Sequence, residues 1–334
     1  MKLADLSTWP DALVALLLCA GVLAVAMTCV AYFTWIERKI AARFQNRIGP
    51  YFVGRPHGWL QPIADVAKLL VKEDIVPRAA DRLLFDLAPV VVVVAALLGF
   101  AFVPVAKGIA ISNHPYSLLL FAAFGSLTLL GTFAAGWASN NKYALVSALR
   151  SVAMVVSYEI PLLLALLVPA VLTGSFNLGD IVEAQRGLWF AFWPGIGWIA
   201  FLVWYVASLA ETNKAPLDLV EAESELVAAY NTEYTGIKFA LFYAGEYAHT
   251  VGSAALGATV FLGGYLGPAF LPGWIWLLLK VIVLFCLTLW VRWTLLRFRI
   301  DHALKLNWMA LFPTALVALV AAAWWVMRSA PWSR

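Results

Sequence analysis

The run from Leu83 to Ala106, LLFDLAPVVVVVAALLGFAFVPVA, is long enough and apolar enough to cross a lipid bilayer as a helix. Comparable runs recur along the whole chain and predict about eight membrane spans. These lie at 12–34, 83–106, 116–138, 147–172, 189–210, 237–263, 274–293 and 306–327. The first run lacks the short apolar core and small-residue cleavage site of a signal peptide, so we expect an uncleaved anchor. The predicted fold class is all-α, a polytopic membrane helical bundle.

The composition supports this fold class. Hydrophobic residues make up 63% of the 334 residues and charged residues 13%, and the mean hydropathy is +0.85. Soluble domains are roughly 45–50% apolar and about 25% charged. Barrel strands would need only about 10 residues with polar alternation, whereas these runs reach about 20. We therefore expect a single integral membrane domain over residues 1–334. The net charge of +4 comes with no isolated basic domain, so we expect the lipid bilayer and no nucleic acid as a partner.

Lysine and arginine predict the topology. They are concentrated in the loops after the first, third, fifth and seventh spans and are sparse in the others. By the positive-inside rule the odd-numbered loops face the cytoplasm, and both termini lie on the opposite side. The long cytoplasmic loops are then 37–82 and 211–236, so a docking partner would bind from the cytoplasm.

The first cytoplasmic loop, 37–82, carries two helical patterns. From Leu60 to Glu73, apolar residues recur at helical spacing opposite charged ones, which predicts an interfacial amphipathic helix or, alternatively, a surface connector. Before it, Lys39, Arg43 and Arg47 share one face of a continuing helix. That cationic face fits either an anchor to lipid phosphates or a docking rim for an acidic partner.

The second cytoplasmic loop, 211–236, is rich in acids. Five carboxylates lie between Glu211 and Glu225. Crowded like charges favour proton uptake by some of them, as a proton relay requires. A solvated acidic docking face is the competing interpretation.

Two acids lie inside predicted spans. Glu159 is followed by Pro161, which we expect to break the helix, and Glu246 lies in the sixth span. Acids within a bilayer are typical of proton pathways, although a neutral acid making one interhelical hydrogen bond is the plainer alternative. Lys280 is a possible countercharge or a residue that reaches toward the interface.

Resident cofactors are not expected. Cys19, Cys29 and Cys286 lie in apolar runs without CxxC spacing, and no dinucleotide fingerprint or phosphate loop is present. We therefore predict that this chain binds no iron–sulfur cluster, flavin or metal.

Several motifs together carry a family resemblance over nearly the whole chain. They are Glu37-Arg38-Lys39 through Gly49-Pro50, Gly58-Trp59-Leu60-Gln61-Pro62-Ile63-Ala64-Asp65 with Lys72-Glu73, Arg150-Ser151 through Ser157-Tyr158-Glu159-Ile160-Pro161, the loop from Ala210 to Gly236, and Trp290-Val291-Arg292. The chain resembles the family of subunit 1, also called the H subunit, of proton-translocating NADH:quinone oxidoreductase, respiratory complex I. Leu217 and Lys214 depart from the residues usual in that family.

The resemblance implies a subunit at the heel of an L-shaped enzyme in the bacterial inner membrane. Its substrate would be a quinone, with ubiquinone expected. Its partners would be the cytoplasmic cluster-bearing and quinone-site subunits, small membrane subunits and antiporter-like subunits. Carried onto this sequence, the quinone-chamber residues are Glu37, Arg38, Arg43, Asp65 and Glu73. The proton-relay residues are Glu159, Glu211, Asp218, Glu221, Glu223, Glu225, Glu233 and Glu246.

Three alternatives remain open at this point. The equivalent subunit of a membrane-bound hydrogenase shares much of the pattern, and quinone dependence would separate the two. An autonomous proton-coupled transporter belongs to another class, but no internal repeat of the kind such proteins often show is evident. A purely structural membrane anchor leaves Glu159 and Glu246 without a purpose.

Overall fold

The computed structural model describes residues 9–108, 110–220, 229–268 and 270–329. The described residues form helices, turns and loops without a β-strand, which confirms the all-α prediction. They group into two compact units, Met1–Ala67 and Lys68–Arg334.

The first unit contains α1 (Trp9–Phe44), a loop and the beginning of α2 (Gln61–Val71). At 36 residues, α1 continues well past the predicted span 12–34 and includes the basic residues Lys39 and Arg43. The prediction that Arg47 continues the same helical face was wrong, because the helix ends at Phe44 and Asn46 adopts a φ of +51°. The rings of Trp35 and Trp59 stack with their centroids 4.7 Å apart. The helix α2 lies within the segment for which an amphipathic helix was predicted.

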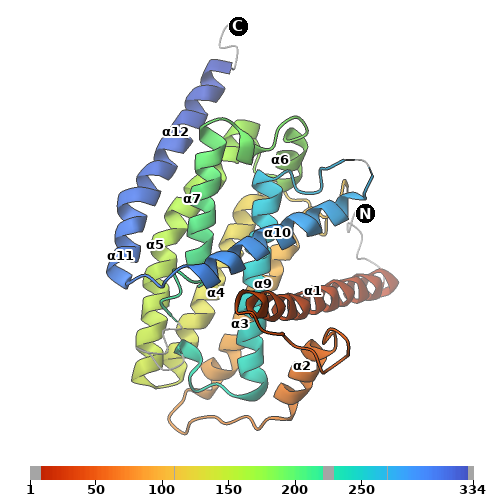
Figure 1. The fold of residues 1–334 in the computed structure, drawn as a ribbon, viewed down its shortest axis with the longest axis vertical. Coiled ribbons are helices and arrows are strands. Elements are labelled where there is room, and N and C mark those ends of the chain that lie inside the picture. The colour runs from red at the N-terminus through yellow and green to blue at the C-terminus, as the bar shows by residue number, and fades with distance from the viewer. Residues whose placement is uncertain (1–8, 109, 221–228, 269, 330–334) are drawn as a thin grey trace. The chain divides into compact units, whose positions relative to one another are not determined.

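The second unit contains the remaining helices, most of which are long (Figure 1). They are α3 (Arg82–Phe100), α4 (Ser117–Ala138), α5 (Lys142–Thr173), α6 (Leu178–Ala184), α7 (Ile196–Glu211), α9 (Gly236–Phe261), α10 (Gly273–Thr294), α11 (Ile300–Leu306) and α12 (Phe312–Ser329), with short turns η1 (Phe190–Phe192), η2 (Ala229–Asn231) and η3 (Asn307–Leu311). The helices α5, α7 and α12 run side by side, and α3 packs against both α4 and α9.

Five helical segments of the described residues are long and apolar enough to cross a membrane. They are Arg82–Phe100, Ser117–Ala138, Lys142–Thr173, Gly273–Thr294 and Ile300–Arg328, and α7 is a shorter apolar helix. The predicted spans 12–34 and 237–263 coincide with α1 and α9. These lengths and compositions identify an integral membrane protein of the polytopic helical class.

The predicted span 189–210 was wrong at its start. The helix α7 begins only at Ile196, after the short turn η1. Pro194 has no N–H to donate, and Gly195 adopts a φ of +77°, which an α-helix does not accommodate. The sequence prediction placed the start too early because the residues before this pair are also apolar. Hydropathy does not indicate where the backbone leaves the helical conformation.

The helix break expected at Pro161 is limited to a single hydrogen bond. The helix α5 runs without interruption from Lys142 to Thr173. Pro161 cannot donate to the carbonyl of Ser157, four residues earlier. Instead, the buried Asn307 donates from Nδ2 to that oxygen at 2.6 Å. A side chain from the distant turn η3 therefore satisfies the carbonyl and keeps the helix intact.

An aromatic core joins α3 and α9 in the second unit. Phe85 of α3 stacks on Tyr234 at a centroid distance of 4.0 Å, and Phe242 of α9 meets Tyr234 edge-on at 4.8 Å. Burial, with a smaller contribution from Asp86, raises the pKa of Tyr234. The segment that leads out of the acidic loop is thus packed between α3 and α9.

Close helix contacts depend on glycine at a few positions. A Cβ at Gly257 of α9 would lie 1.9 Å from the ring of Trp204 on α7, which is buried. Lipid provides no hydrophobic force between membrane helices, so their association depends on close packing. Small residues allow that close approach. Gly257 therefore permits the close contact between α7 and α9.

Substituting Gly257→Ala should lower the unfolding temperature in detergent by several degrees, because overpacking costs about 1–3 kcal/mol. The measurement is thermal unfolding followed by circular dichroism. Gly187→Ala is the matched control, since a Cβ there meets no atom within 4 Å. Equal unfolding temperatures for the two variants would contradict the close contact.

Candidate functional site

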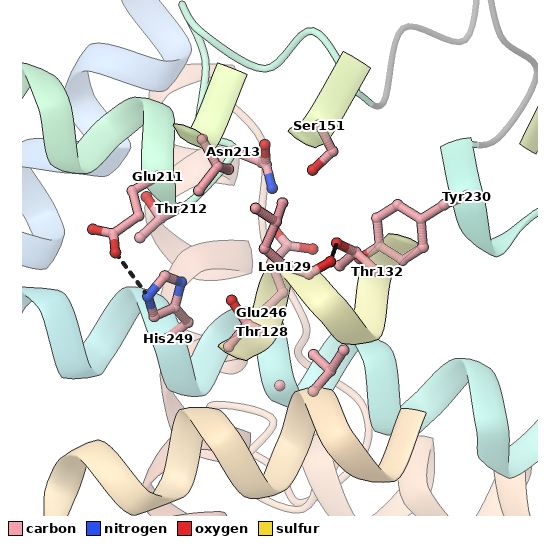
Figure 2. A pocket seen from close by; sticks show the side chains of 13 residues that line it. Thr128, Leu129, Thr132, Ser151, Glu211, Thr212, Asn213, Tyr230, Glu246 and His249 are labelled. Carbon is pink, nitrogen blue, oxygen red and sulfur yellow. Dashed lines mark hydrogen bonds and ion pairs between the residues drawn. The ribbon is translucent and has the colours of Figure 1, made fainter. Parts of the chain in front are cut away.

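A small polar pocket lies inside the second unit, where α3, α4, α5, α7 and α9 meet the turns that follow α7 (Figure 2). Its volume is about 30 Å³, and it is lined by Val92, Thr128, Leu129, Thr132, Ser151, Val155, Glu211, Thr212, Asn213, Tyr230, Gly245, Glu246 and His249. A water molecule needs roughly 10–15 Å³ of such space and two or more polar partners. Volume and lining therefore suit water.

Glu211 and His249 meet at one side of the pocket. The distance from Glu211 Oε1 to His249 Nε2 is 3.5 Å, and the side chains are only 13% and 11% exposed. Glu211 is the last residue of α7, where a carboxylate meets the negative end of the helix dipole. A nearby group that can become cationic is therefore favourable.

Glu246 lies one helical turn before His249 on α9 and forms an ion pair with Lys214. The Lys214 side chain is 2% exposed, and its Nζ lies 4.7 Å from the centroid of the Tyr247 ring. The chain reverses after α7 through Asn213, whose φ is +50°, and the Lys214 N–H donates to Leu209 O at 2.9 Å. This turn places the buried Lys214 side chain beside Glu246, whose side chain is 15% exposed.

Glu159 is held beside the pocket and does not line it. Ser126 Oγ of α4 donates to Glu159 Oε1 of α5 at 2.5 Å. Ser126 follows Gly125, where a Cβ would lie 3.0 Å from Glu211 Oε1 and 3.4 Å from His249 Nε2. Two neighbouring residues of α4 thus lie close to predicted relay acids, Gly125 to Glu211 and Ser126 to Glu159.

The other predicted relay acids lie elsewhere. The buried Asp218 accepts from Arg297 at 3.3 Å, and Glu233 accepts from Asn141 Nδ2 at 2.6 Å. Neither lines the pocket. The remaining three predicted acids, Glu221, Glu223 and Glu225, lie outside the described residues.

The residues predicted for a quinone chamber are divided between the two units. In the first unit, Arg38 donates to Asp65 Oδ2 at 2.5 Å, and Gln61 Nε2 donates to Asp65 Oδ1 at 3.0 Å. Glu37 and Arg43 lie on α1. Glu73 belongs to the second unit, where its side chain is exposed and its carbonyl accepts from Thr235 Oγ1 at 3.2 Å.

The sequence analysis did not identify two residues that interact with acidic side chains, His249 and Lys238. His249 lies three positions after Glu246, so helical spacing could have identified it as part of the same face. Lys238, at the start of α9, pairs with Asp74 at 2.8 Å and Asp86 at 2.6 Å. No sequence signal links Lys238 to these distant acids.

Within the described residues, no group of three or more His, Cys, Asp or Glu side chains is arranged to hold a metal ion. The chemistry that the pocket offers is exchange of protons among carboxylates, an imidazole, hydroxyls and water.

Comparison with known proteins places this chain in a family. A family model described as NADH dehydrogenase matches residues 17–323. A relative from Dehalococcoides mccartyi (strain CBDB1), named as the H subunit of NADH-quinone oxidoreductase, is 43% identical over 319 residues, covering 96% of this chain and 88% of the relative. A protein of the same name from Rickettsia typhi (strain Wilmington) is 45% identical over 299 residues, covering 87% of each chain. With the match extending over nearly all of its length, the chain belongs to the NADH dehydrogenase family.

Proposed function

We propose that this chain is a membrane subunit of an NADH-quinone oxidoreductase, in which it helps to form the quinone chamber and couples quinone reduction to proton translocation. The observation that carries the proposal is the 43–45% identity, over most of the chain, to relatives named as the H subunit of that enzyme. The polytopic helical class agrees with a membrane subunit. Quinone, most simply ubiquinone, is the proposed substrate.

The first unit contains four of the five residues proposed for the quinone chamber. Arg38 and Asp65 form a charged pair, and the stacked rings of Trp35 and Trp59 lie in the same unit. Aromatic faces and a few oriented polar groups are typical of sites that bind flat, mostly apolar ligands. The remaining chamber residues, Glu37, Arg43 and Glu73, are assigned from the family resemblance.

The pocket supplies the proposed relay. A proton moving through a membrane protein needs titratable groups connected by hydroxyls or water, because the surrounding lipid carries no protons. Glu211 and Glu246 line a cavity that suits water, and Glu159 is bound to the same face of the bundle through Ser126. Asp218, Glu221, Glu223, Glu225 and Glu233 complete the proposed relay toward the cytoplasmic loop.

The wider assembly follows from the same proposal. The chain would lie in the bacterial inner membrane as one integral membrane domain, with 37–82 and 211–236 as cytoplasmic loops and both termini periplasmic. Cluster-bearing and quinone-site subunits would dock on those loops, and small membrane subunits and antiporter-like subunits would lie beside the bundle. Electrons would reach quinone from the iron–sulfur cluster of a docked subunit.

Substituting Glu211→Gln in the assembled enzyme should lower both NADH:quinone turnover and proton translocation by about tenfold or more. Glutamine has a similar shape, but its amide cannot release and take up a proton as a carboxyl group does. The measurement uses inverted membrane vesicles, with NADH:ferricyanide activity reporting assembled enzyme.

Asp301→Asn is the matched control, since Asp301 and Arg299 form an exposed pair that should contribute little. Full turnover and pumping in Glu211→Gln would contradict the role of Glu211 in the relay.

Substituting Lys214→Met should reduce the amount of assembled enzyme, because it leaves Glu246 charged and without its buried cation. Breaking a buried ion pair in this way costs about 3–5 kcal/mol. Assembly is measured on native gels of solubilised membranes.

Adding Glu246→Gln to Lys214→Met removes the uncompensated charge and should recover assembly without restoring proton translocation. A double variant no better assembled than the single one would show that Lys214 stabilises the fold through other contacts. A single variant that assembled normally would contradict the ion pair's structural role.

A further inference from the structure

The pocket contains a residue that neither the sequence motifs nor the family resemblance singled out, His249. Histidine is the side chain whose ordinary pKa, about 6.5, lies closest to neutral pH, so it commonly transfers protons. It faces Glu211 across 3.5 Å. That separation is longer than the roughly 2.7–3.2 Å of an ordinary N–H···O hydrogen bond, so a small movement can make or release the bond.

The two acids that line the pocket have different partners. Glu246 is paired with the ammonium of Lys214. Glu211 faces His249, which is cationic only when it holds a second proton. Charge neutrality around Glu211 therefore depends on where a proton resides, whereas charge neutrality around Glu246 does not.

The other elements around the imidazole bring few charges to it. On α4, Gly125 leaves room at the contact, since a Cβ there would crowd both Glu211 Oε1 and His249 Nε2. From α3 and α5, the pocket receives Val92, Ser151 and Val155. Besides His249, the titratable groups of the described residues that line the pocket are Glu211 on α7, Tyr230 on η2 and Glu246 on α9. Lys214 is paired with Glu246, and Glu159 of α5 is bound to Ser126 nearby.

Two small cavities lie near the contact between Glu211 and His249. The ring's second nitrogen points away from Glu211 in Figure 2, and His249 is one of the residues that line the cavity of about 30 Å³. A second cavity of about 10 Å³ shares Thr212 and is lined by hydroxyls of Ser208, Thr250, Ser253 and Thr288, among others. This second cavity has about the volume that one water molecule needs. Thr250, which follows His249 in the chain, is one of its lining residues.

We propose that Glu211 and His249 form a proton-sharing pair and that His249 is a proton-carrying residue of the relay. A proton moves from the Glu211 carboxyl to Nε2, leaving a carboxylate and an imidazolium. The imidazolium then releases the proton on Nδ1 to water in the pocket. The pair has then released one proton, which leaves the Glu211 carboxylate and an imidazole protonated on Nε2. Uptake of a new proton by Glu211 and return of the imidazole to its Nδ1-protonated tautomer complete the cycle, with no further reactant. This inference rests on the proposed relay function.

The test is His249→Gln in the assembled enzyme, in inverted vesicles. Glutamine keeps a donor that can reach Glu211 but cannot accept a proton. We expect normal NADH:ferricyanide activity, with NADH-driven proton translocation reduced about tenfold. The pH profile of the residual activity should differ from that of the wild type, because the variant lacks one titratable group of the relay. His302→Gln, at an exposed site on α11, should keep the wild-type profile.

A second measurement does not depend on how the histidine variant folds. Infrared difference spectra of histidine-labelled wild-type enzyme, recorded on quinone reduction, should contain an imidazolium band that Glu211→Gln removes. Absence of the band from the wild type would overturn the proposal.

The outcomes also separate this inference from the function on which it rests. Full pumping with an unchanged pH profile in His249→Gln, while Glu211→Gln is impaired, would overturn the role of His249 alone. Full pumping in both variants would overturn the relay itself.

Discussion

A charged side chain inside a lipid bilayer has to find its opposite charge within the protein, because lipid tails provide none. In the second unit this constraint is met most completely by Lys214 and Glu246, which pair in the interior beside the Tyr247 ring. The turn after α7 and the middle of α9 are thereby held together. Glu211, Thr212 and Asn213, which precede Lys214 in the chain, are brought to the same pocket.

Packing and hydrogen bonding maintain that arrangement without adding charge. Gly257 lets α9 approach Trp204 on α7, and Gly125 leaves space where Glu211 meets His249. Asn307 replaces the hydrogen bond that Pro161 cannot make, so α5 stays continuous and presents Ser151 and Val155 to the pocket. Polar groups inside the bundle thus find hydrogen-bond partners within the protein, as a membrane protein requires for stability.

Much of this architecture could be predicted from the sequence, since hydropathy and the distribution of basic residues act locally. The helical class, the position of most spans and the acids Glu159, Glu211 and Glu246 all follow from such local patterns. What could not be predicted depends on contacts between distant residues. Examples are the bond from Asn307 to Ser157, the pairing of Lys238 with Asp74 and Asp86, and the meeting of His249 with Glu211. The late start of α7 at Ile196 was missed for a different reason, because a Pro-Gly pair within an apolar run leaves hydropathy unchanged.

The proposed relay makes the pocket a conductor of protons in which one acid is permanently compensated and another depends on a shared proton. The two acids therefore have distinct tasks. In this proposal, Glu246 with Lys214 sets a fixed local charge, whereas Glu211 with His249 allows the charge to change during turnover. A family member placed between a quinone chamber and the pumping part of an enzyme would need both properties.

The most direct test is the number of protons that inverted vesicles take up per NADH oxidised when Glu211 is replaced by glutamine and the Lys214–Glu246 pair is kept. We expect assembled enzyme that still passes electrons from NADH to ferricyanide but translocates few protons through the quinone-coupled reaction. An unchanged number of protons at an unchanged rate would contradict the claim that this pocket conducts them.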